Sequence, residues 1–227
     1  MFNHLLTVAQ YKEAIQPFDG GAFEKMIFLV SVVNDLDILD VQDWRADKLI
    51  QHYKIALDAV QIKSRHKESI EIDEQIHSLI PFKKLSLGMF IDLENSIDDI
   101  GKTCAILYTK AEKYSKVNIE ERAEKMEQVP IDFVFGAYKS YLNFRESFFK
   151  AYDVFSDPFE GVDVDELDEE ERVIYNEEIK QREKQGDQWM TVVNALSAND
   201  VTKFEKVLKL NLFLCFNQLS FLKSHNS

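Results

Sequence analysis

Only a few short stretches of this 227-residue chain have residue types and spacings that could support chemistry. Glu74-Gln-Ile-His77 has the Glu-x-x-His spacing with which helical di-iron proteins place two ligands on one helix face. Such a site needs two of these motifs and two further Glu residues on other helices, and the sequence has no second Glu-x-x-His. The motif therefore does not predict a metal site.

The acidic run from Asp157 to Asp168 offers carboxylates of the kind that bind Ca²⁺, but their positions are wrong. A calcium loop that began at Asp157 would have Phe159 at its third position, Gly161 at its fifth and Asp168 at its twelfth. An EF-hand loop requires oxygen-bearing side chains at the third and fifth positions, and Glu at the twelfth. We expect no calcium site here, and no metal or cofactor elsewhere.

The sequence also lacks the patterns of nucleophilic catalysis and of phosphate binding. None of its five histidines belongs to a recognised motif with a nucleophilic Ser or Cys. The glycines are isolated except for Gly20-Gly21, and no Gly-Lys-Ser/Thr follows that pair. Cys104 and Cys215 both lie in apolar stretches, as expected of reduced, buried thiols. We predict no catalytic residue and expect that the protein is not an enzyme.

The composition limits the classes of partner. A formal charge of −13 repels nucleic acid and anionic membranes, because affinity for phosphates comes mainly from Lys and Arg. The longest apolar stretch, Val207 to Leu222, is interrupted by Lys209, Asn211 and Asn217, so it falls short of the ~20 apolar residues of a membrane span. We expect neither nucleic acid nor membrane as a partner.

The elements that would position any functional residue are mostly helices. Gly and Pro together number only eleven, which leaves long stretches without helix breakers. The predicted fold is mainly all-α, an irregular multi-helix domain with a small β-hairpin near residues 69–80. We divide the chain into a main helical domain (1–156), an acidic, charged segment (157–184) and a C-terminal helical segment (185–227) that packs on the main domain or on a partner.

Local signals place several of these elements. Thr7 and Gln10 have capping-box spacing, so a helix is predicted to begin at Thr7. Ile70, Ile72 and Ile76 alternate with polar residues, which predicts a hairpin that turns near Asp73-Glu74. The residues from Val201 to Leu222 are predicted to form one helix.

An unusual concentration of aromatic residues marks the stretch from Ile131 to Phe155, where nine of twenty-five residues are aromatic. Each ring buries roughly 150–250 Å², so this helix must lie in a core or against another protein. The C-terminal helix is apolar nearly all round, which requires the same. We predict that both helices contact a partner, through Phe135, Tyr138, Phe149, Tyr152, Phe213, Phe216 and Phe221.

Parts of the sequence resemble a family of phage proteins. Phe90-Ile-Asp-Leu-Glu94, Ala105-Ile-Leu-Tyr108, Glu121-Arg-Ala123 and Pro130 resemble a layout found among proteins of the structural gene clusters of tailed bacteriophages, especially those that infect Bacteroidetes. Leu6-Thr-Val-Ala-Gln-Tyr11 and the segment Glu24–Val33 resemble the N-terminal helices of tail-assembly chaperone-like proteins. The resemblance covers about residues 5–150. It implies a helical protein that acts in virion assembly in the host cell cytoplasm, with other phage structural proteins or itself as partners.

Three hypotheses follow for the function. The leading one is a non-catalytic phage assembly protein that binds apolar segments of another virion protein, such as the tape measure protein. The second is a permanent component of the virion, such as a connector or a packaged protein, with large obligate interfaces. The third is a helical metal-dependent hydrolase, which would require His52, His66 or His77 to converge with buried carboxylates.

Overall fold

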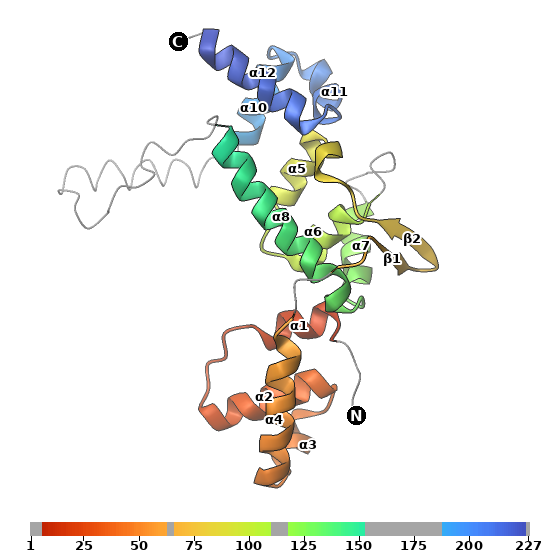
Figure 1. The fold of residues 1–227 in the computed structure, drawn as a ribbon, viewed down its shortest axis with the longest axis vertical. Helices are drawn as coiled ribbons and strands as arrows, with labels where there is room; N and C mark the ends of the chain where they lie inside the picture. Colours follow the sequence, from red (N-terminus) through yellow and green to blue (C-terminus); the bar gives the residue numbers. More distant parts are fainter. Residues whose placement is uncertain (1–5, 63–65, 110–117, 153–187, 226–227) are drawn as a thin grey trace, which may run out of the picture. The chain divides into compact units, whose positions relative to one another are not determined.

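The structure of the protein, a computed structural model, describes residues 6–62, 66–109, 118–152 and 188–225. In these residues the chain is mainly α-helical and its only strands form one antiparallel hairpin, which confirms the predicted fold class (Figure 1). The elements are α1 (Val8–Ala14), α2 (Ala22–Asn34), α3 (Ile38–Gln42), α4 (Ala46–Val60), β1 (Ser69–Ile72), β2 (Gln75–Ser78), η1 (Phe82–Lys84), α5 (Leu87–Glu94), α6 (Ile100–Leu107), α7 (Ile119–Met126), α8 (Ile131–Ala151), α10 (Gln188–Ser197), η4 (Val201–Lys203), α11 (Phe204–Leu208) and α12 (Leu212–His225).

The chain forms two compact units that do not follow the order of the sequence. The first unit consists of residues 1–80 and 92–142, and the second of residues 81–91 and 143–227. The division falls inside α5 and inside α8, so each of these helices contributes residues to both units. The C-terminal helices therefore pack with residues 81–91 and with the end of α8. The predicted acidic segment, 157–184, lies outside the described residues.

The first unit begins with α1, and the next three helices, α2, α3 and α4, surround a small core of their own. The capping box at the start of α1 forms as predicted: Thr7 accepts from the backbone N–H of Gln10, whose side chain accepts from the backbone N–H of Thr7. Helix α2 then packs against both α3 and α4. Their shared interior is formed by six buried residues: Ile27, Leu29, Val30, Val41, Leu49 and Ala56.

Lys12 on α1 connects three segments of the first unit. Its Nζ lies 3.1 Å from Oδ1 of Asp99 and 2.6 Å from Oε1 of Glu127. Asp99 also caps α6, because its side chain accepts from the backbone N–H of Lys102. Gly101 allows this close packing, since a Cβ at that position would collide with the Glu127 carboxylate. The cluster joins α1, the start of α6 and the end of α7.

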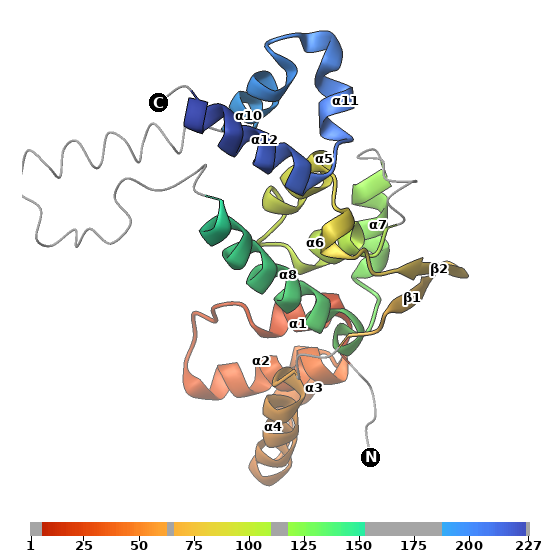
Figure 2. The same cartoon turned by 45° about the horizontal axis from the view of Figure 1, so that its top comes forward.

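The core of the second unit is aromatic, and it is the part of the molecule in which α10, α11 and α12 lie (Figure 2). The fully buried ring of Phe90 on α5 lies 5.2 Å from the ring of Phe148 and 6.4 Å from that of Phe216, measured between centroids. Gly88 lets α5 approach α11, because a Cβ there would lie 3.1 Å from the carbonyl oxygen of Leu208. The aromatic end of α8 thus packs against the C-terminal helices of the same chain.

The prediction of one helix from Val201 to Leu222 is wrong. The segment contains η4, α11 and α12, and a break around residue 211 separates the last two. At the break the N–H of Leu87 donates to the carbonyl of Leu210, and the N–H of Leu212 donates to the carbonyl of Leu85, both at 2.9 Å. The helix breaks here because the backbone groups of residues 210 and 212 form hydrogen bonds with residues 85–87. The helical spacing of apolar residues in the sequence cannot reveal these bonds.

Within the described residues, no helix has both the length and the apolar character that crossing a bilayer requires.

Replacing Asn211 with alanine should test the helix break. The Asn211 side chain accepts from the backbone N–H of Phe213 at the start of α12 and donates to the carbonyl of Lys83 at 2.8 Å. Loss of this cap and of the second hydrogen bond should lower the free energy of unfolding by about 1–2 kcal/mol in chemical denaturation. Gln218→Ala, on the exposed face of α12, is the control and should change stability little; equal effects of the two variants would contradict the assigned role.

The Asp99→Asn variant should reveal a pH-dependent contribution to stability. Burial raises the pKa of Asp99, but the backbone N–H of Lys102 and the Lys12 ammonium outweigh burial, so the pKa lies below its ordinary value of 3.8. A group whose pKa is lower in the folded state than in the unfolded state stabilises the fold in its ionised form. For Asp99 this stabilisation is fully present at pH values above the unfolded-state pKa, and it is lost as the pH falls through the folded-state pKa.

Because Asn caps helices as well as Asp does, Asp99→Asn removes the charge and keeps the cap. Denaturation at several pH values should show the wild type more stable by about 0.5–1 kcal/mol near pH 7, a figure discounted for a side chain that is 35% exposed. The difference should shrink as pH falls below about 4. A difference that does not depend on pH would contradict the charge assignment.

Candidate functional site: a groove beside the β-hairpin

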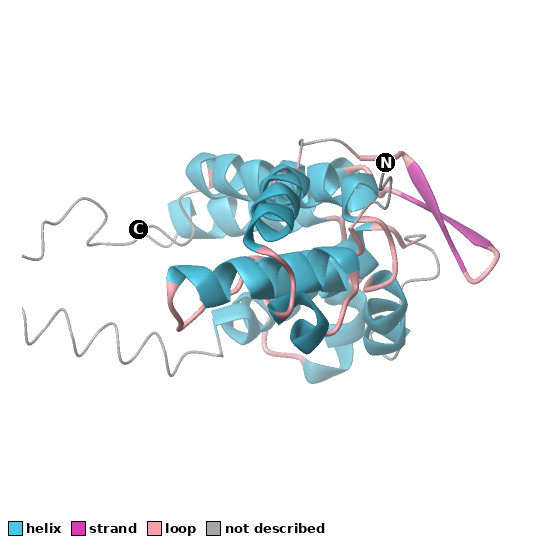
Figure 3. Ribbon diagram, turned by 90° about the horizontal axis from the view of Figure 1, so that it is seen from below, coloured by secondary structure: helices cyan, strands magenta, loops and turns pink. Residues whose placement is uncertain are grey.

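The hairpin forms where the alternating isoleucines predict it (Figure 3). Strands β1 and β2 pair so that Ile72 lies opposite Gln75, and Asp73 and Glu74 form the two-residue turn between them. Both turn residues have positive φ, 50° and 60°, as a type I′ turn requires. On one face of the hairpin, Ile70 and Ile72 are buried in the core. Asp73 and Glu74 thus adopt the positive φ angles at which glycine and asparagine are usually found.

The outer edge of β1 carries backbone groups that do not face β2. The N–H of Leu79 donates to the carbonyl of Glu68 at 2.8 Å, which identifies that pair as hydrogen-bonded. Hydrogen-bonded and non-hydrogen-bonded pairs alternate along an antiparallel ladder. In the observed register Ser69 and Glu71 therefore belong to non-hydrogen-bonded pairs. The N–H and C=O groups of residues in such pairs point away from the partner strand, which here is β2.

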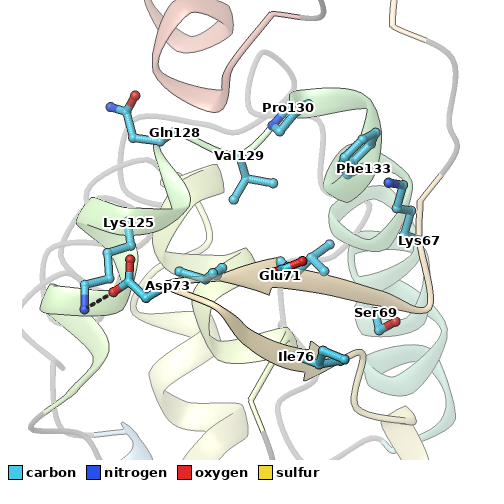
Figure 4. Close-up of a pocket in the computed structure, with 12 residues that line it drawn as sticks. Lys67, Ser69, Glu71, Asp73, Ile76, Lys125, Gln128, Val129, Pro130 and Phe133 are labelled. Carbon is cyan, nitrogen blue, oxygen red and sulfur yellow. Dashed lines mark ion pairs between the residues drawn. The ribbon is translucent and has the colours of Figure 1, made fainter.

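This edge of β1 forms one wall of a groove with a volume of about 590 Å³ (Figure 4). The opposite wall is the connection between α7 and α8, and it contributes Gln128, Val129 and Pro130. That wall is fixed in place, because the carbonyl of Val129 accepts from the N–H of Val8 at 2.9 Å. The N–H of Ile131, at the start of α8, likewise donates to the carbonyl of Leu6 at 2.7 Å. The groove thus lies between a strand edge and a rigid segment.

Charged side chains mark both ends of the groove (Figure 4). At the turn end, Nζ of Lys125 lies 2.6 Å from Oδ2 of Asp73. At the other end, Nζ of Lys67 lies 3.3 Å from the centroid of the Phe133 ring. The N–H of Lys67 also donates to the carbonyl of Phe133 at 2.8 Å, and the Tyr108 hydroxyl lies 2.7 Å from the Lys67 carbonyl oxygen. Residue 67 therefore already uses both of its backbone groups.

A second hollow, of about 680 Å³, also adjoins the hairpin and shares Ile72, Asp73, Ile76 and Lys125 with the first. It is lined by residues 72–77 of the hairpin and, on α7, by Glu121, Arg122 and Lys125. Of these two hollows, the first includes the strand residues Ser69 and Glu71 and the second does not.

The predicted partner-binding residues of the first unit are held inside it. Phe135 is 8% exposed, and its ring meets that of Tyr11 edge-on, with the centroids 5.4 Å apart. Tyr138 is half-buried and donates its hydroxyl to the carbonyl of Ile97 at 2.9 Å. This burial removes Phe135 from any free surface, which corrects the prediction for that residue.

Four more predicted residues surround Phe148 in the second unit. The rings of Phe149, Tyr152, Phe213 and Phe216 lie between 4.7 and 6.0 Å from the Phe148 ring, centroid to centroid. Phe216 is fully buried, so its predicted role on a partner surface is also corrected, while the other three are half-buried. These rings stabilise the second unit by packing on one another.

Phe221 is the exposed member of the predicted set. It lies on α12 and is 54% exposed, and Leu214, two turns earlier on the same helix face, is 64% exposed. The imidazole of His225 packs on the Phe221 ring with the centroids 4.0 Å apart. A partner contact through Phe221 stays a prediction.

The described residues contain no group of three or more His, Cys, Asp and Glu side chains that could hold a metal ion. His52 lies against the ring of Trp44, and Nε2 of His66 is 4.0 Å from a carboxylate oxygen of Glu68. Both cysteines are free and buried, as predicted. Burial raises the pKa of Cys215 to about 11 and that of Cys104 further still, which suppresses the reactive thiolate.

Sequence reasoning found the hairpin but did not treat its edge as a binding site. The signal was present, because a ribbon of two strands always leaves outer edges without a strand partner. The wall formed by residues 128–130 had no sequence signal, since it depends on hydrogen bonds to residues more than a hundred positions away.

The hairpin turn gives a direct test of this geometry. Glycine adopts positive φ at little cost, so Glu74→Gly should raise the free energy of unfolding by up to about 1 kcal/mol in chemical denaturation. The matched control, Glu71→Gly, removes the same side chain from the interior of β1 and should lower stability by a similar amount. Destabilisation by both variants would mean that the turn does not have the φ angles described.

The chain matches no known family model, no curated protein and no solved structure.

Proposed function

We propose that this protein is a non-catalytic assembly protein that binds apolar segments of another protein, in the tail-assembly role that the phage resemblance implies. The observation that carries the proposal is the distribution of exposed apolar side chains. Of the fourteen large apolar residues exposed in the described part of the chain, eight lie between residues 15 and 57. We call these eight the N-terminal apolar set: Ile15, Phe23, Leu36, Ile38, Leu39, Ile50, Ile55 and Leu57.

The set is more than the ordinary exposure of single apolar residues. Leu36, Ile38 and Leu39 lie within four consecutive positions at α3. Ile50 and Leu57 lie two turns apart on one face of α4. Both α3 and α4 pack on α2, whose contacts with them bury a different set of side chains. Helices α3 and α4 therefore carry apolar side chains that their contacts with α2 leave exposed, and exposed apolar side chains are common at protein-binding surfaces.

Energetics favours a protein partner for this surface. Leu39 is 65% exposed and Ile50 is 47% exposed, so covering either side chain should contribute about 1 kcal/mol. A partner that covers several members of the set gains enough to bind without any charged contact. The net charge of −13 keeps a chain with such a surface in solution when no partner is bound.

A second candidate function is that of a permanent virion component. The same apolar set would then form an obligate interface in the finished particle, of more than about 2,000 Å². Both functions need the set, and they differ in where the protein is found after assembly. Immunoblotting of purified particles separates them, because a chaperone is absent from mature virions.

The double variant Leu39→Ser/Ile50→Ser should test the proposal. Cells that express the chain together with the genes next to its own should yield a phage structural protein in pull-down with wild type. The double variant should bind it about ten- to thirty-fold more weakly, because two apolar contacts of about 1 kcal/mol each are lost. Circular dichroism should be unchanged, since neither residue belongs to the core.

The matched control is Val201→Ser, which removes a 71% exposed apolar side chain from the second unit. It should bind the partner as wild type does. Recovery of no structural protein by the wild type, or equal binding by the double variant, would overturn the proposal.

A further inference from the structure

We propose that the groove beside the hairpin binds an extended, apolar segment of a partner polypeptide, which adds to β1 as a third strand. This site lies outside the N-terminal apolar set, so the inference goes beyond the function proposed above and can fail or hold independently of it. The partner is identified by its backbone, because the groove offers strand-like donors and acceptors and a lining in which apolar and polar residues are mixed.

The backbone of β1 specifies an extended occupant. The N–H and C=O groups of Ser69 and Glu71 point away from β2, and they recur every second residue. Only a chain in the β conformation presents its own donors and acceptors at that spacing. Residue 67, the preceding member of this series, already bonds through its N–H to the carbonyl of Phe133. The edge of β1 is therefore already hydrogen-bonded at residue 67, and its next outward-facing backbone groups, those of residues 69 and 71, lie in the groove.

The side chains of the groove specify an apolar and uncharged occupant. Ile76, which is 67% exposed, and the half-buried Phe133 supply apolar surface, while Ile70, Ile72 and Val129 are buried. The charged lining residues balance, with two cations at positions 67 and 125 and two carboxylates at positions 71 and 73. Such a lining gives no net field to attract a charged peptide, so affinity should depend little on salt.

The shape of the groove favours a single strand over a second copy of the whole chain. A volume of about 590 Å³ lies within the ~300–1,000 Å³ of ordinary ligand pockets. The wall at residues 128–130 is held by hydrogen bonds from the N–H of residue 8 to the carbonyl of residue 129 and from the N–H of residue 131 to the carbonyl of residue 6, so it does not swing open for a folded domain. A peptide segment enters such a groove without rearrangement.

Synthetic peptides of about seven residues with blocked ends, enough to span β1 at ~3.3 Å per residue, are the probes for the test. One set is rich in Val, Ile and Thr, and the other in Gly, Ser and Asp. Fluorescence anisotropy should detect binding of the first set to the full chain, with affinity changing less than about twofold between low and high salt. Failure of both sets to bind, or binding only of the second set, would overturn the proposal.

Two proline variants then locate the bound strand. Glu71→Pro removes an N–H that faces the groove, and Ser78→Pro removes the equivalent outward N–H on the free edge of β2. Glu71→Pro should weaken peptide binding about tenfold or more, and Ser78→Pro should leave it unchanged. Glu71→Gln should also bind as wild type does, because the side-chain charge is not the contact. Unchanged binding by Glu71→Pro would overturn the proposal.

Amide hydrogen exchange on the wild-type protein keeps the test valid if a proline variant does not fold. Bound peptide should slow exchange at residues 69 and 71 and leave residues 76 and 78 unaffected. Protection at residues 76 and 78 instead would place the peptide on β2 and contradict the proposal. Sedimentation should show a monomer without peptide; a dimer that Glu71→Pro dissociates would identify a second copy as the occupant and would also overturn it.

Discussion

The junction between α7 and α8 is held by backbone hydrogen bonds to the residues around the start of α1, and much of the first unit depends on it. Val8 and Ala9 donate to the carbonyls of Val129 and Glu127, and Ile131 donates to the carbonyl of Leu6. Pro130 lies in the middle of this contact, where its missing N–H costs no hydrogen bond. The contact fixes where α8 begins, and through α8 it fixes the Phe133 carbonyl that anchors the chain entering β1.

Local sequence signals determined those elements whose stability is local. The capping box at Thr7 and the isoleucine alternation at residues 70–76 were predictable, because the partners lie within a few residues of each other. The break at Asn211 was not predictable, because it depends on backbone groups of residues 85–87. Sequence also could not tell whether an aromatic ring faces a core or a partner, and Phe216 and Phe221 on the same helix differ in this respect.

The two surfaces of the first unit offer different physical interactions to a partner. The N-terminal apolar set offers side-chain area on helices, which is non-directional and tolerant of sequence. The edge of β1 offers directional backbone groups inside a bounded groove. The two proposals together imply that the chain holds a partner segment that is still unfolded, since an unfolded chain exposes apolar side chains and free backbone groups together.

The interleaving of the two units along the chain has a consequence for how the protein is made. Residues 81–91 of the second unit leave the ribosome well before the C-terminal helices against which they pack. After Phe90 the ribosome must add about 125 further residues before it reaches Phe216, against which Phe90 packs. This synthesis takes roughly 6–25 seconds at ~5–20 residues per second. Until Phe216 is made, the large aromatic ring on α5 lacks one of the residues that cover it in the finished fold, so the growing polypeptide itself passes through a stage in which it is prone to associate.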